Sequence, residues 1–163
     1  MLKKKYIAAI AALIMLIIAI TIFVAINQQK RYEDEDVFAK MAIWNGPLNG
    51  NNLPVYYFVI KNDGTLVSYF GTARSHHDLS RNRFMLFTRQ RDVTVLSDQD
   101  FQRISEMVNA VAADNYSGEF SRVTTHAHIL LLHNENIYGG SSGDITVPLF
   151  DLANEILRLS PLW

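Results

Sequence analysis

The chain has 163 residues, no cysteine, and a nearly balanced charge of 15 lysines and arginines against 16 aspartates and glutamates. This balance argues against nucleic acid as a partner, because nucleic-acid-binding proteins carry a basic excess. The lack of cysteine excludes disulfide bonds, thiolate metal sites and a cysteine nucleophile.

An apolar stretch covers residues 6–26, where the hydroxyls of Tyr6 and Thr21 are the only polar side-chain groups. A helix of this length spans about 31 Å at ~1.5 Å per residue, close to the ~30 Å hydrocarbon layer of a membrane. The sequence therefore predicts a transmembrane helix, with the lipid bilayer as its partner and residues 1–5 as a basic cytoplasmic tail.

The residues around this stretch bear on its orientation. Three lysines precede it and resemble the first region of a secretory signal. Bulky Phe23 stands where a cleavage site needs a small residue before Ala25, which favours an uncleaved, single-pass signal anchor. We expect a cell-membrane protein with its N-terminus in the cytoplasm and its C-terminal domain outside.

Residues 27–52 are interpreted as a juxtamembrane stalk. Val37, Phe38, Met41 and Trp44 recur at helical spacing, which predicts a helix over residues 34–44. Residues 45–52 consist mainly of turn-forming types and predict a loop. The remainder, 53–163, is expected to form one extracytoplasmic domain.

The pattern within that domain predicts strands first. Runs at 55–60 and 66–70 flank Asp63-Gly64, a strong hairpin signal. After a loop at 71–82, a strand is expected at 83–91, with 93–96 as its continuation or a short partner. Further strand patterns cover 122–132, 137–138 and 145–147.

Two helices complete the prediction. Ser97 is a suitable N-cap for a helix ending near residue 113, and Pro148 suits the first turn of a final helix. The expected fold class is α+β, with one N-terminal transmembrane helix followed by a small domain of an antiparallel sheet and two packed helices.

Histidines are the first candidate for chemistry. His126 and His128 lie two apart on the predicted strand and share a face, so with His133 or the His76-His77 pair they are weak metal candidates. The alternative is an ordinary strand surface, and no H-E-x-x-H pattern supports zinc chemistry. We expect no cofactor.

Residues 139–143 match G-x-S-x-G, the pattern of a hydrolase nucleophile. That motif needs a helix directly after the serine, whereas residues 144–147 resemble a strand. We therefore expect a flexible hairpin or linker loop and no catalytic residue.

Arginines form the domain's charge concentration, with five between residues 74 and 91. If Arg83, Arg89 and Arg91 share a strand face, they form a basic strip suited to phosphate or carboxylate groups. Lipid headgroups, an acidic polymer or another envelope protein would be its partners. The alternative is a sheet edge protected by charge.

The predicted function is accordingly a membrane-anchored, non-enzymatic binding or interaction module. The alternative is a metal-dependent or other small envelope enzyme that uses the histidines or an acid such as Asp144. A structural role in an anchored complex is a third possibility, and the sequence leaves the oligomeric state open.

Overall fold

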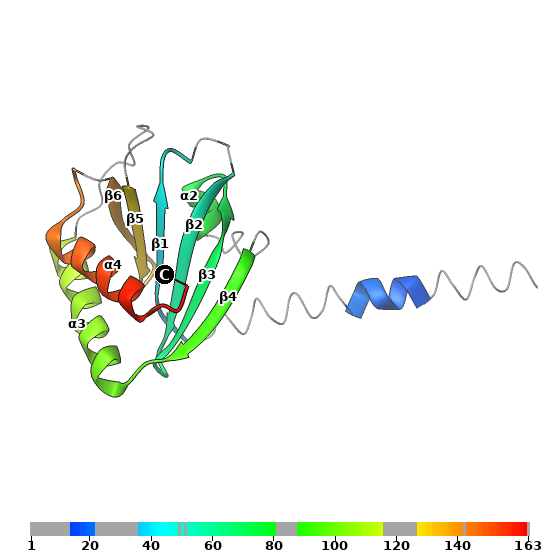
Figure 1. Ribbon diagram of the computed structural model, residues 1–163, viewed down its shortest axis with the longest axis horizontal. Helices are drawn as coiled ribbons and strands as arrows, with labels where there is room; N and C mark the ends of the chain where they lie inside the picture. The colour runs from blue at the N-terminus through cyan, green and yellow to red at the C-terminus, as the bar shows by residue number, and fades with distance from the viewer. Residues whose placement is uncertain are drawn as a thin grey trace, which may run out of the picture. The chain divides into compact units, whose positions relative to one another are not determined.

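The computed structural model describes residues 14–21, 36–48, 50, 52–80, 88–115, 127–141 and 143–162. The chain divides into two units, Met1–Asp36 and Val37–Trp163. Residues 14–21 of the first unit form a helix (Figure 1). The second unit contains the sheet and the remaining helices.

The transmembrane helix predicted over residues 6–26, of which the structure describes 14–21, is not supported. Across the residues that the structure describes, no helix combines the length and apolar character of a membrane span. This finding contradicts the predicted fold class, which included a transmembrane helix, and the description as a single-pass signal anchor.

The second unit is built on a six-stranded antiparallel sheet. In chain order the strands are β1 (Val37–Asn45), β2 (Leu53–Lys61), β3 (Thr65–Ala73), β4 (Thr88–Val95), β5 (Ala127–His133) and β6 (Asn136–Ser141). Their spatial order is β4-β3-β2-β1-β5-β6, and every neighbouring pair is antiparallel. β4 and β6 are therefore the two edges of the sheet as described.

The helix predicted over residues 34–44 is wrong, because this stretch contains β1. β1 lies in the middle of the sheet and pairs with both β2 and β5. Ala39 and Met41 are buried on one face, whereas Ala42 and Trp44 are buried on the other. Burial on both faces removes the polar positions of an ordinary alternating strand, and the resulting apolar spacing resembles a helix.

The hairpin predicted around Asp63-Gly64 is confirmed. β2 and β3 pair from Leu53↔Ala73 to Ile60↔Leu66, and Gly64 has a φ of 80°. Asp63 Oδ1 accepts a hydrogen bond from the backbone N–H of Thr65 at 2.8 Å. That bond lowers the pKa of the Asp63 carboxyl below its ordinary value.

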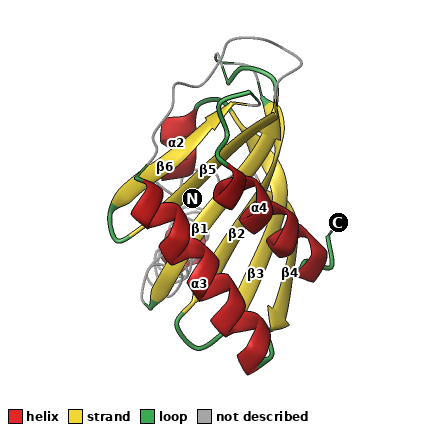
Figure 2. Ribbon diagram, turned by 90° about the vertical axis from the view of Figure 1, so that its left-hand side faces the viewer, coloured by secondary structure: helices red, strands yellow, loops and turns green. Residues whose placement is uncertain are grey.

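The described residues of this unit include three helices: α2 (His76–Ser80), α3 (Asp98–Asp114) and α4 (Val147–Leu159). Ser97 caps α3 as predicted, since its Oγ accepts from the backbone N–H of Asp100 at 3.1 Å. The loop predicted over residues 71–82 is wrong, because β3 extends to Ala73 and α2 follows. Figure 2 shows α3 and α4 side by side across one face of the sheet.

Each face of the sheet has its own apolar core. Ile104, Val108 and Val111 of α3 pack with the buried stripe of α4 over one face. On the other face, Tyr57 and Tyr69 are buried, and the Tyr57 hydroxyl donates to the carbonyl of Leu79 in α2 at 3.3 Å. The sheet is thus the central layer of this unit.

A cluster of charged side chains connects α3 to α4, the two helices that cover the first of these apolar cores. Arg158 donates to buried Glu155 from Nε at 3.1 Å and from Nη2 at 2.7 Å, and it reaches Asp100 of α3 at 3.4 Å. Arg103 of α3 lies 3.5 Å from the same Glu155 carboxylate. The hydrogen bonds from Arg158 hold the pKa of Glu155 below its ordinary value.

Candidate functional site

The β4 edge is the most exposed part of the sheet. Residues 89–93 and Val95 are exposed, including 45% of Val93 and 76% of Val95. At the opposite edge, residues 138–141 of β6 are buried. The two edges therefore differ, and β4 is the one that presents its side chains to the surroundings.

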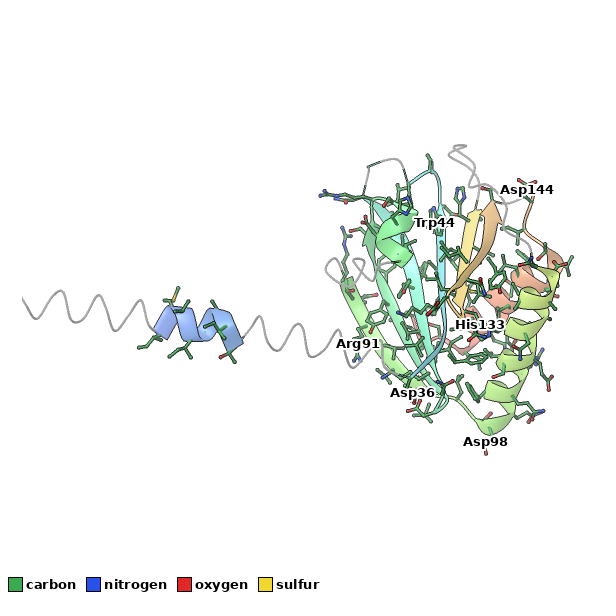
Figure 3. All side chains as sticks on the ribbon, turned by 180° about the vertical axis from the view of Figure 1, so that it is seen from behind. Asp36, Trp44, Arg91, Asp98, His133 and Asp144 are labelled. Atoms are coloured by element: carbon green, nitrogen blue, oxygen red, sulfur yellow. The ribbon has the colours of Figure 1, made fainter. Side chains whose placement is uncertain are left out.

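Arg91 projects from this edge over the second face of the sheet, which is the face on which Tyr57 and Tyr69 are buried. It lies opposite Tyr69 in the β3–β4 register, and its guanidinium carbon is 5.8 Å from the centre of the Tyr69 ring. Contact with the ring face stabilises a guanidinium and orients it. Figure 3 labels Arg91 on the strand at the edge.

Arg89 lies where the pairing becomes irregular. Phe70 pairs with Gln90, but the next residue of β3, Gly71, pairs with Thr88, so Arg89 is one extra residue in β4. Such a bulge interrupts the alternation of side chains between the two faces. Arg83 lies outside the described residues, and a strip formed by Arg83, Arg89 and Arg91 on one face remains a prediction.

Asp92 was not recognised from the sequence as part of this edge. Its carboxylate accepts a hydrogen bond from the backbone N–H of the next residue, Val93, at 2.7 Å. Asp92 follows Arg89 and Arg91 and precedes the exposed Val93 and Val95. The arginines and valines stand at every second position, and this pattern could have indicated an edge strand. The sequence pattern predicts residues 93–96 either as a continuation of the preceding strand or as a short partner, and the structure shows the continuation, since β4 covers Thr88–Val95.

His128 and His133, both on β5, are five residues apart and therefore lie on opposite faces of the sheet. His126 lies outside the described residues, and His128 is buried on β5, stacked on Trp44 with ring centres 5.2 Å apart. His133 Nδ1–H donates to the carbonyl of Phe38 at 2.8 Å, because a carbonyl can only accept. Among residues with a described position, no three histidines or acids form a metal-binding group.

The sequence predicts a flexible loop for the G-x-S-x-G motif, but its first three residues, 139–141, are the last three residues of strand β6. Ser141 is the last residue of β6, and its Oγ lies 3.0 Å from Nδ1 of His128. The strand expected at 145–147 is also wrong, because α4 begins at Val147. A nucleophile elbow needs its helix directly after the serine, whereas residues 142–146 separate Ser141 from α4.

Two other features separate this serine from a nucleophile elbow. Ser141 and His128 are 0% and 1% exposed, so neither side chain reaches the surface. The elbow also holds its serine in a strained turn, whereas Ser141 is a strand residue without a positive φ. The pair therefore has the geometry of a buried hydrogen bond between neighbouring strands.

A separate apolar cavity of about 260 Å³ lies beside α4. Ile43 and Ile129 line it from the sheet, and Phe150, Ala153 and Leu157 line it from the helix. It is larger than the ~150 Å³ that holds benzene in an engineered core, but smaller than a usual pocket for a drug-sized molecule. Among the described residues that line it, Asn154 has the one polar side chain, so these residues form no set of chemically active groups.

Comparison with known proteins adds no assignment, since no protein-family model matches the chain and no curated protein matches it.

Proposed function

We propose that the unit Val37–Trp163 is a binding module that holds an acidic partner protein along β4. The observation that carries this proposal is the exposed edge strand with two arginines, Arg89 and Arg91. Guanidinium groups bind carboxylates through paired hydrogen bonds, and arginine is enriched at protein interfaces. A partner at this edge needs no rearrangement of the core, because the edge residues are already exposed.

The test measures the affinity of the full chain for polyglutamate by microscale thermophoresis. In the double variant Arg89→Ala and Arg91→Ala, we expect an affinity about fivefold lower, because each exposed ion contact contributes roughly 0.2–1 kcal/mol. The matched control is Lys61→Ala with Arg103→Ala, which removes the same charge elsewhere in the unit. The proposal fails if both double variants lose affinity equally.

A further inference from the structure

We propose that the partner binds by strand addition: an extended acidic segment pairs with residues 90–95 of β4 and becomes a seventh strand of the sheet. This inference rests on the proposed function and adds the mode of binding. A sheet edge presents unpaired backbone N–H and C=O groups, which an extended peptide can use. The β3–β4 register is regular from Val95 to Gln90, which gives the incoming segment a straight template.

The side chains of β4 define the pattern of that segment. Arg91, Val93 and Val95 lie opposite Tyr69, Val67 and Thr65, and so occupy the second face of the sheet. Directly opposite residues in a strand pair point to the same face. A matching segment therefore places an acidic residue beside Arg91 and apolar residues beside Val93 and Val95, with polar residues at the positions between.

The same register argues against a second copy of this chain as the occupant. If β4 paired with β4 of a second copy about a twofold axis, the two strands would be antiparallel. Each residue would then lie opposite a residue whose side chain is on the same face of the sheet. Arg91 can then face Arg91, Val93 or Val95, and Asp92 can face Gln90, Asp92 or Thr94. No such register within residues 90–95 places Arg91 opposite Asp92. The positive charge of Arg91 is therefore complementary to an acidic segment of another protein and not to a second copy of β4.

The Asp92 side chain competes with an incoming strand for a backbone N–H of β4. Its carboxylate already accepts from the N–H of Val93 at 2.7 Å, in the middle of the exposed stretch. It is also a negative charge beside the site for an acidic segment. Removal of this carboxylate should strengthen binding, whereas removal of Arg91 should weaken it.

The experiment uses fluorescence anisotropy with the full chain and labelled seven-residue peptides. The probe has threonine at every second position, and the three positions between them carry valine, valine and glutamate. A second peptide has the reversed sequence, so that one peptide suits parallel pairing and the other suits antiparallel pairing. The charge control replaces the glutamate by lysine. Two further probes have the same side chains, but each carries N-methyl groups on one of the two alternating sets of backbone nitrogens.

Strand addition predicts that one methylated probe loses binding and the other keeps it, because only alternate N–H groups of an added strand face its neighbour. We expect Arg91→Ala to lower the affinity about threefold and Asp92→Ala to raise it by a similar factor, with Arg103→Ala as the matched control.

Two results would overturn strand addition. One is equal binding of both methylated probes, and the other is equal affinity for the glutamate and lysine probes. If polyglutamate still binds through Arg89 and Arg91 in either case, the binding function stands and only its mode is wrong. If polyglutamate shows no dependence on these arginines, the proposed function fails as well.

Discussion

At the scale of single residues, Glu155 shows how a buried charge is accommodated. It is 7% exposed, yet Arg158 satisfies both carboxylate oxygens and Arg103 lies nearby. Removal of Arg158 would leave this buried carboxylate without its main partner and cost more than an exposed ion pair contributes, whereas removal of Glu155 leaves two arginines that are more than half exposed. This residue was not recognised as functional or structural from the sequence, where it reads as an ordinary helix acid.

Glu155→Gln tests the pH dependence of this cluster. The pKa of Glu155 is lower in the folded state than its ordinary value of 4.5. Its stabilisation is therefore fully present above pH 4.5 and is lost as the pH falls through the lower, folded pKa. We expect the variant to be less stable by about 1 kcal/mol at pH 7 and the difference to shrink below pH 4.5. Urea unfolding at both pH values measures this, and a difference that grows on acidification would contradict it.

At the scale of elements, the β2–β3 hairpin depends on its turn. Gly64 has a φ of 80°, which residues with a side chain adopt at a cost of roughly 1–2 kcal/mol. The position has space, since an added Cβ would come no closer than 3.9 Å to the neighbouring atoms. Backbone strain, rather than a clash, therefore explains the need for glycine.

Gly64→Val should lower the free energy of unfolding by about 2 kcal/mol, because a β-branched residue is poorly suited to a positive φ. Gly64→Asn should cost clearly less, because asparagine tolerates the left-handed region. Chemical unfolding of both variants measures the difference. Equal losses would show that the turn is not strained.

At the scale of the whole unit, the position of a strand decides what its residues contribute. Met41 in the central strand β1 is fully buried, whereas Val95 on the edge strand β4 is 76% exposed. Both are apolar strand residues, and the sequence alone does not rank them. The sheet order separates a residue that stabilises the core from one that is available to a partner.

Met41→Ala should therefore cost about 2–5 kcal/mol, the range for truncation of a large core residue. Val95→Ala should change stability by no more than about 0.5 kcal/mol, as expected for an exposed position. Thermal and urea unfolding of the two variants provide the comparison. A large loss for Val95→Ala would mean that the β4 edge supports the core and is not reserved for binding.

The sequence by itself determined the elements whose signals are local. Asp63-Gly64 marked the hairpin, Ser97 marked the start of α3, and the apolar stripe after Pro148 marked α4. Each of these depends on a turn conformation, a cap or a helical face, which a few neighbouring residues can specify.

Only the tertiary structure decided which strands are central and which side chains meet. β1 resembled a helix because both its faces are buried, and Ser141 met His128 because β6 pairs with β5. The same pairing order made β4 an edge and placed Arg91 on Tyr69. Hydrophobic spacing reports which residues are buried, but contacts between distant segments depend on strand order and register, which no short stretch of sequence encodes.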